Sequence, residues 1–315
     1  MSYKNELVAG FWRYASARND PAWLFDRREV GSRPPVFTSE NADLNVLRAP
    51  GEHPGRLASL LKTVPRRSRH NWFRSMASSQ ALAQSVFGNL IVADQIALLS
   101  DIETEDGEPL IGASPESAHL EFGIDFLGEP RKTSLDVLVT HSNGYRVAFE
   151  CKLTETEVGK CSRPGLGVAD PYYERDHCDG TYTCQRGRSE RCSLTNVGVA
   201  YWNHVPGLFH WASDCDHRPC PLRETYQLVR NVLAVSVDSK GVLDTGNGHV
   251  VLIYDERNPA FVSDGAGRDA YEQTRGALRE KKILRKCSWQ RILRRLREDS
   301  DLKWLTDELS AKYGL

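Results

Sequence analysis

The chain has 315 residues, with 41 Lys and Arg against 42 Asp and Glu and with eight cysteines. This length is enough to bury a sizeable core, and the balanced charge means that any nucleic-acid surface must come from local segregation of charge. Because no apolar run approaches membrane-spanning length and the N-terminus lacks a signal-peptide core, we predict a cytoplasmic protein with no membrane partner. Because the cytoplasm is reducing, we expect the cysteines to bind a metal or to remain buried thiols, and not to form disulfides.

Residues 1–64 are predicted to form an arm around the body of the protein. Aromatic residues are scattered there among Pro, Gly and charges, and only Leu7, Phe11 and Tyr14 have the spacing of one helix face. No chemistry is indicated in this part of the chain.

Residues 65–100 are predicted to be helical, with Ser68 as a cap and an apolar stripe behind it. The segment opens with a basic cluster, Pro-Arg-Arg-Ser-Arg-His at 65–70, which could contact phosphate or could be a solvated loop. A second helix is predicted to start at Ser114-Pro115-Glu116, a cap residue followed by proline and an acid. That helix would carry Glu121.

Residues 134–140 and 145–153 read as two strands joined by a tight turn at Ser142-Asn143-Gly144. If all three turn residues form the loop, Asp136 lies opposite Glu150, and Lys152 lies on the same face of the sheet. If only Asn143 and Gly144 form the loop, Asp136 faces Cys151 and the cluster is broken. The sequence permits both registers.

Two opposed carboxylates repel each other unless a cation lies between them, and oxygen ligands suit Mg²⁺ or Mn²⁺. A lysine beside them can orient or deprotonate a water, or can stabilise charge on a phosphate. Asp136, Glu150 and Lys152 therefore suit metal-assisted phosphodiester hydrolysis. The alternative is an ordinary charged hairpin face, but the apolar residues on both sides indicate a buried sheet, where such charges are costly.

Residues 155–221 form a long insertion with little periodicity, and a loop of this kind needs something to hold it. Structural zinc or an iron–sulfur cluster would serve, and the four cysteines that we predict as ligands are Cys178, Cys184, Cys192 and Cys220. None of the spacings is that of a standard zinc finger, so free, packed thiols are the alternative.

A helix is predicted over 222–237, with Arg223, Gln227, Arg230 and Asn231 on the side opposite its buried stripe. A buried strand follows at 250–254, which completes a ββαβ unit. From Gly276 to Arg297 the chain is strongly basic and suits a helix pair whose exposed cationic stripe could contact a DNA backbone.

Asp136 followed by Glu150-Cys151-Lys152 resembles the core of the PD-(D/E)xK nuclease superfamily, which has the restriction-endonuclease-like fold. The order of short motifs along the chain is similar to that in a bacterial branch of these proteins. Ser78-Ser79-Gln80 lies in a helix before the hairpin, and Lys312-Tyr313-Gly314 lies at the end of the chain. Leu135 replaces the proline that usually precedes the aspartate. The resemblance implies that Glu121 joins Asp136 and Glu150 at the metal and that Gln227 supports the substrate or the catalytic lysine. Glu116 and Asp125 are rivals to Glu121.

We therefore expect an α/β protein with a mixed sheet flanked by helices: a nuclease core over 65–265, the cysteine-rich insertion within it, and a basic helical segment over 266–315. The expected activity is Mg²⁺- or Mn²⁺-dependent cleavage of DNA, related to restriction or defence, and duplex cutting suggests a homodimer. The alternatives are a non-cleaving DNA-binding module on the same fold and a metal-stabilised scaffold. RNA also stays open as the substrate.

Overall fold

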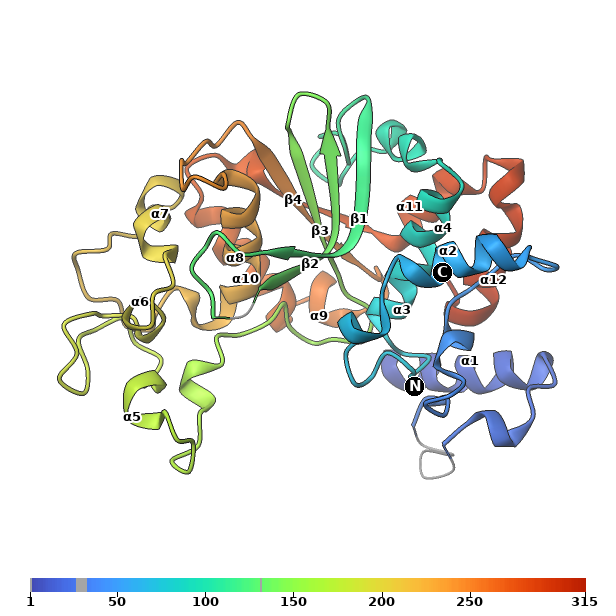
Figure 1. The fold of residues 1–315 in the computed structure, drawn as a ribbon, viewed down its shortest axis with the longest axis horizontal. Helices are drawn as coiled ribbons and strands as arrows, with labels where there is room; N and C mark the ends of the chain where they lie inside the picture. The colour runs from blue at the N-terminus through green and yellow to red at the C-terminus, as the bar shows by residue number, and fades with distance from the viewer. Residues whose placement is uncertain (1, 27–32, 131) are drawn as a thin grey trace.

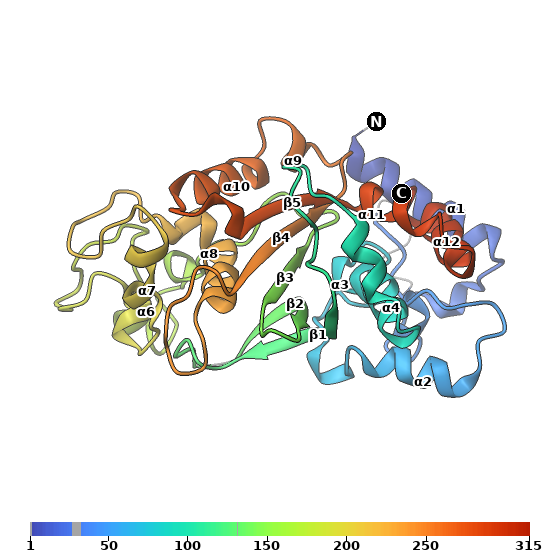
Figure 2. The ribbon, with the colours of Figure 1, turned by 90° about the horizontal axis from the view of Figure 1, so that it is seen from above.

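The computed structural model describes residues 2–26, 33–130 and 132–315. Its centre is a five-stranded mixed sheet in the order β1-β2-β3-β4-β5, antiparallel from β1 to β3 and parallel from β3 to β5. Figure 1 and Figure 2 show this sheet running through the middle of the molecule, with helices on both sides. The α/β architecture is the one that the sequence predicts. The strands are β1 (Pro115–Ile124), β2 (Thr133–His141), β3 (Arg146–Cys151), β4 (Gly248–Tyr254) and β5 (Leu284–Ser288).

The β2–β3 hairpin has the register of a three-residue loop. Val137 pairs with Phe149, and the backbone N–H of His141 donates to the carbonyl of Tyr145 at 2.9 Å. Gly144 closes the turn with a φ of +82°, in the left-handed region that glycine adopts without strain. Asp136 is therefore directly opposite Glu150, which confirms the first of the two registers that the sequence permits.

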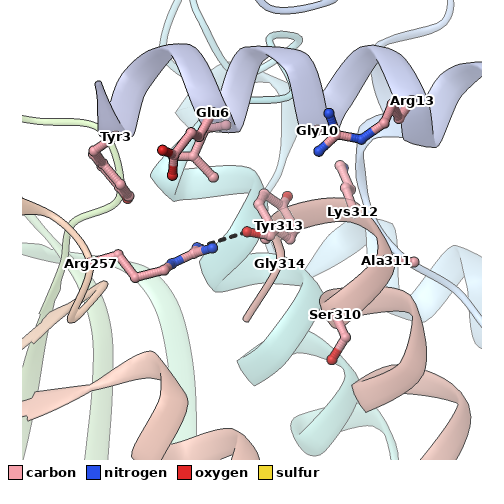
Figure 3. Close-up of a pocket in the computed structure, with 11 residues that line it drawn as sticks. Tyr3, Glu6, Gly10, Arg13, Arg257, Ser310, Ala311, Lys312, Tyr313 and Gly314 are labelled. Atoms are coloured by element: carbon pink, nitrogen blue, oxygen red, sulfur yellow. Dashed lines mark hydrogen bonds between the residues drawn. The ribbon is translucent and has the colours of Figure 1, made fainter. Parts of the chain in front are cut away.

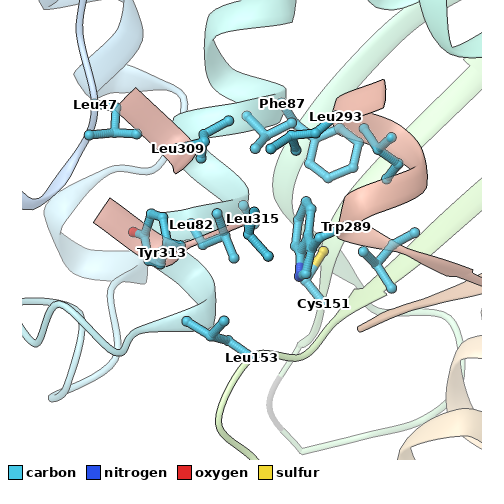
Figure 4. Packing of buried hydrophobic residues seen from close by; sticks show 14 of the residues in the cluster. Leu47, Leu82, Phe87, Cys151, Leu153, Trp289, Leu293, Leu309, Tyr313 and Leu315 are labelled. Atoms are coloured by element: carbon cyan, nitrogen blue, oxygen red, sulfur yellow. The ribbon is translucent and has the colours of Figure 1, made fainter. Parts of the chain in front are cut away.

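The two faces of the sheet belong to two separate hydrophobic cores. Val137, Val147 and Phe149 pack on one face against α3, α4, α11 and α12, whereas Leu138 and Ala148 pack on the other against α8 and α10. Figure 4 shows the first core, where Trp289 lies beside Cys151, and the rings of Phe87 and Trp289 are 6.0 Å apart between centroids. The helices are α3 (Ser79–Ala83), α4 (Asn89–Val92), α8 (Leu222–Ser236), α10 (Ala266–Ala277), α11 (Trp289–Leu296) and α12 (Lys303–Tyr313), and a π-helical turn at Gln84–Gly88 joins α3 to α4.

The predicted helix over 65–100 is only partly correct, because the regular helix spans 79–92 and Ser78 caps it instead of Ser68. The Ser78 hydroxyl accepts from the N–H of Ala81 at 3.2 Å. Residues 69–78 instead fold back on the arm, where the N–H of Met76 donates to the carbonyl of Pro35.

The helix predicted from Ser114 is wrong, because this segment is strand β1. Its backbone groups pair with β2 from Pro115 to Ile124, with a register shift between Pro115 and Ser117 and no pair at Glu121. Pro115 stands at the first position, where a missing N–H costs no ladder bond. A capping signal is worth only about 1 kcal/mol, so pairing with β2 overrides it. Glu121 consequently lies on a strand, at a kink where its φ is +51°.

The basic helix pair predicted over 276–297 is also wrong in part, because the segment contains β5, the last strand of the sheet, followed by α11. An acidic stretch, residues 101–108, lies along it and pairs with Arg275 and with three of the nine basic side chains of the predicted stripe. The ion pairs are Arg275–Asp106 (3.3 Å), Lys282–Glu108 (3.0 Å), Lys286–Glu105 (3.3 Å) and Arg295–Asp101 (2.8 Å).

The N-terminal arm includes α1 (Tyr3–Ala17) and α2 (Pro54–Lys62) and shares the core of the sheet. Leu7, Phe11 and Tyr14 are buried, as their spacing predicts, and Phe11 meets Tyr313 of α12 edge to face at 5.7 Å between ring centroids. Figure 3 shows a cavity of about 440 Å³ between α1 and α12, where Arg257 donates to the carbonyl of Tyr313 at 2.8 Å. None of the residues predicted for the nuclease site lines this cavity.

The insertion contains the short helices α5 (Tyr173–Asp176), α6 (Ser193–Asn196) and α7 (Tyr201–Leu208), and it extends to one side of the sheet in Figure 1. It has an aromatic stack of its own, in which Tyr182 lies 3.6 Å from Trp202 between ring centroids. Among the helices of the described ranges, none is both long and apolar enough to cross a membrane.

Lys312 is fully buried near the C-terminus and joins α12 to the arm. Its Nζ donates to the carbonyl of Asn45 at 2.6 Å and to the Oδ1 of the same residue at 2.8 Å. Burial, helped by the charge of Arg18, lowers the pKa of Lys312 to about 7. A neutral amine has two N–H groups, which match the two acceptors.

Stability should depend on pH through Lys312. Between pH about 7 and the unfolded pKa of about 10.4, the unfolded chain holds a proton that the folded chain has lost, so stability rises with pH. Relative to Lys312→Met, the wild-type free energy of unfolding should rise by up to about 1.4 kcal/mol per pH unit in this window and stay constant below it. Urea unfolding of both proteins across the range measures this difference. A constant difference at every pH would contradict the assignment.

Candidate active site

Asp136 and Glu150 form the centre of the candidate site, on the face of the sheet that packs against α8. The backbone N–H of Cys151 donates to Asp136 Oδ2 at 2.7 Å, which fixes this carboxylate against β3. Burial, followed by the charge of Glu150, raises the pKa of Asp136 well above its usual value. Such a shift is what two opposed carboxylates produce when no cation separates them.

Glu150 is held by three side-chain donors. Its Oε1 accepts from Lys152 Nζ and from Gln227 Nε2, both at 2.7 Å, and its Oε2 accepts from Asn231 Nδ2 at 2.7 Å. Both amides come from α8, four residues apart and therefore on one face of the helix. The predicted placement of Gln227 and Asn231 away from the buried side is thus wrong, because Asn231 is completely buried. The four-residue spacing could have identified Asn231, which we did not predict as a site residue.

Lys152 is buried beside these acids and carries a charge. Burial alone would lower the pKa of Lys152, but Glu150, Glu155 and Asp136 outweigh it and raise this pKa to about 12. Its Nζ also donates to Gln227 Oε1, at 3.4 Å. An ammonium group has three N–H donors, and the described residues accept from two of them, so one N–H is left for a water or a phosphate oxygen.

Glu121 lies on β1 across from Asp136, between the paired residues Leu120 and Phe122. Its Oε1 accepts from Gln80 Nε2 and its Oε2 from Ser134 Oγ, both at 2.6 Å. Burial raises the pKa of Glu121 and the charge of Glu150 adds to this shift, while the hydrogen bonds from Ser134 and Gln80 oppose it. The structure therefore brings Glu121 near the pair, with both oxygens already occupied. Its rival Glu116 is exposed, and its other rival Asp125 forms an ion pair with Lys132 at 2.8 Å.

Gly159 and Glu155 support the site from the start of the insertion, and neither was predicted. Gly159 has a φ of +117°, and a Cβ there would lie 2.1 Å from Gln227 Oε1, so only glycine lets the chain pass this close to the glutamine. Glu155 accepts from Ser79 Oγ at 2.6 Å and adds negative charge near Lys152.

The donor set suits a hard divalent cation. In the part of the chain that the structure describes, no three or more His, Cys, Asp or Glu side chains are arranged so that they could hold a metal ion as they stand. Mg²⁺, however, is usually bound by one or two protein carboxylates, with waters and substrate phosphates completing its shell. Burial is the main cause of the raised pKa of Asp136, and the charge of Glu150 adds to it while that of Lys152 opposes it. A divalent cation at this carboxylate would favour its ionised form.

The cysteines predicted as metal ligands are only partly brought together. Cys184 is exposed, and its thiol donates to the carbonyl of Ser189 at 3.3 Å. Cys178, Cys192 and Cys220 lie near one another and near Cys161: burial comes first in raising the pKa of the Cys220 thiol, and the other three cysteines add to it. Because no metal-holding group is present among the described residues, structural zinc or an iron–sulfur cluster here stays a prediction.

Asp136→Asn should stabilise the metal-free protein above neutral pH. The wild-type carboxyl has a raised pKa when folded, so the folded chain holds a proton that the unfolded chain loses above about pH 3.9, and stability falls as pH rises through this window. An asparagine keeps the acceptor for Cys151 and removes this cost.

Thermal unfolding of wild type and variant in EDTA, at several pH values, measures the effect. The advantage of the variant should shrink as the pH falls, and added Mg²⁺ should raise the melting temperature of the wild type alone. A variant that is less stable than the wild type at every pH would refute the electrostatic interpretation.

Comparison with known proteins gives one family. The family model described as Restriction Endonuclease associating with ARP matches residues 53–314, which is most of the chain and includes every residue of the candidate site. Neither the curated proteins nor the solved structures contain a match to this chain. On the strength of this match, the chain belongs to the family described as Restriction Endonuclease associating with ARP.

Proposed function

We propose that this protein is a metal-dependent DNA endonuclease of the PD-(D/E)xK kind that hydrolyses phosphodiester bonds in restriction or defence. The observation that carries the proposal is the direct opposition of Asp136 and Glu150, with the buried, charged Lys152 on the same face. Glu150 and Lys152 are buried and Asp136 is partly buried beside them. Ionisable groups in such a place are costly to keep and mark functional sites more often than chance allows. Membership of a restriction-endonuclease family supports the same activity.

Asp136 and Glu150 would hold the metal, and Glu121 would join if it released Gln80 or Ser134. A bound Mg²⁺ or Mn²⁺ would supply Lewis-acid stabilisation of charge on the phosphate and a lowered pKa for a bound water. Metal binding needs an ionised Asp136, so affinity for the metal should increase with pH.

Lys152 would position the attacking water and stabilise charge on the phosphate. With its pKa raised to about 12 it stays protonated at neutral pH, so it acts as a cation and hydrogen-bond donor rather than as the base. Its bonds to Glu150 and Gln227 aim the remaining N–H. Gln227 and Asn231 are positioning residues that orient Glu150.

A non-cleaving DNA-binding module is the second candidate, and one observation favours it. Both oxygens of Glu150 already accept hydrogen bonds from protein donors, so a metal would have to compete with them. DNA as the partner, a homodimer for duplex cutting, and action together with the ARP that the family description names are further parts of the proposal.

Cleavage of plasmid and linear duplex DNA with Mg²⁺ or Mn²⁺ tests the function. Asp136→Ala and Lys152→Ala should each lower the rate by on the order of 10²-fold or more, because each removes a group aimed at the reacting phosphate. Asn231→Ala should lower the rate less, since this residue acts through Glu150.

Asp125→Ala and Lys132→Ala are matched controls, because these residues form an exposed Asp–Lys pair just after β1 and just before β2, outside the candidate site. Both should cut at the wild-type rate, and circular dichroism shows whether every variant is folded. DNA binding without cleavage by the wild type would favour the binding module. Equal cleavage by all variants would place the activity elsewhere.

A further inference from the structure

The loop from Arg66 to Arg74 combines basic and aromatic side chains next to the candidate site. Its sequence is Arg-Arg-Ser-Arg-His-Asn-Trp-Phe-Arg. Six of these nine residues line an open cavity of about 430 Å³, and Arg67 and Trp72 lie outside this lining. Trp72 is 59% exposed, although large aromatic side chains are usually buried. One exposed tryptophan is not unusual on a protein surface, and Trp72 is distinguished by the basic side chains around it and by the hydrogen bonds that hold its loop.

Gln80 connects this loop to the catalytic hairpin. Its Oε1 accepts from the backbone N–H of His70 at 3.1 Å, and its Nε2 donates to the carbonyl of Ser68 at 3.1 Å. The same Nε2 donates to Glu121 at 2.6 Å, and Glu121 lies across from Asp136. One buried amide therefore fixes the backbone of the basic loop at the edge of the carboxylate cluster.

The loop keeps an excess of positive charge. Arg66 and Arg69 share one acid, Asp43, at 3.0 and 2.5 Å, and Arg69 is also packed over the ring of Phe73. Arg67 is exposed and has no ion pair or hydrogen bond with any residue that the structure describes. Arg74 pairs with Asp26 at 3.5 Å, so two acids face the four arginines of the loop, and Arg67 is the arginine among them without an ion pair to a described residue.

The other basic segment of the chain is also paired in part with acids. Residues 275–297 meet the acidic loop at 101–108, which pairs with four of their basic side chains. The other basic residues of 275–297 have no partner in the acidic loop, so charge alone does not separate the two segments. The loop at 66–74 is the better place for a nucleic-acid strand to approach the candidate site because it combines the exposed Trp72 with the Gln80 link to Glu121.

We propose that the loop Arg66–Arg74 binds a nucleic-acid strand with unpaired bases beside the candidate site, with Arg66 and Arg67 on phosphates and the ring of Trp72 stacked on a base. An aromatic platform beside a basic groove is how proteins hold single strands without reading their sequence. The inference rests on the proposed nuclease function and adds its substrate class: DNA with a single-stranded segment next to the cut.

Nucleic-acid binding measured in EDTA tests the role of this loop, because without a divalent metal the proposed cleavage cannot occur. Fluorescence anisotropy would compare a fluorescein-labelled single-stranded DNA, the same strand as a blunt duplex, and a single-stranded RNA of the same sequence. Trp72→Ala should weaken single-strand binding about five-fold or more and duplex binding less, whereas Trp72→Phe should keep most of the affinity. Arg67→Ala should weaken binding to both forms and reduce the salt slope by about one.

Two controls match these variants. Tyr172→Ala removes an aromatic side chain that is also 59% exposed but lies in the insertion, and Arg294→Ala removes an exposed arginine from the rival basic segment. Neither should change affinity. No effect of Trp72→Ala, an equal loss for single strand and duplex, or a larger loss with Arg294→Ala than with Arg67→Ala would each overturn the proposal.

The RNA arm separates this inference from the proposed function. Comparable binding of DNA and RNA strands would support the loop, because stacking and phosphate contacts ignore the 2′-hydroxyl. Failure of the wild type to cut any DNA in Mg²⁺ would count against the nuclease and would leave the metal-free binding result unaffected.

Discussion

The repulsion between Asp136 and Glu150 is the constraint around which the candidate site is built. The hairpin register puts the two carboxylates face to face, and the surrounding chain supplies donors to hold them: the N–H of Cys151, the ammonium of Lys152 and two amides from α8. These donors restrain Glu150 fully, yet the pKa of Asp136 stays raised, first by burial and then by Glu150. The protein thus keeps an electrostatic cost at one residue, which a divalent cation would relieve.

Helix α8 and the loop before it have a shared role in this arrangement. Gln227 touches both Glu150 and Lys152, and the backbone of Gly159 passes so close to this glutamine that any side chain would displace it. The insertion therefore begins by packing against a site residue, which couples its position to the geometry of the carboxylates. Any interaction that orders the insertion, including a metal bound at its cysteines, would therefore also help to hold the side chain of Gln227 in position.

Charge is distributed unevenly over a chain that is neutral as a whole. The acidic loop at 101–108 covers the basic segment near β5, and this contact protects the edge strand of the sheet as well as neutralising it. The basic loop at 66–74 has only Asp43 to balance Arg66 and Arg69. Overall charge therefore says little about nucleic-acid binding here, because ion pairs between distant segments decide which arginines remain available.

Local patterns in the sequence determined the β2–β3 hairpin, helix α8, the inward packing of Cys151 and the short list of acids, because alternation and spacing depend on neighbouring residues alone. Tertiary structure decided the rest. Pairing with β2 turned the segment after Ser114 into a strand, the distant acidic loop paired with part of the basic C-terminal segment, and packing of α8 on the sheet buried Asn231. Each of these outcomes depends on contacts between residues far apart in the chain, which no local pattern contains.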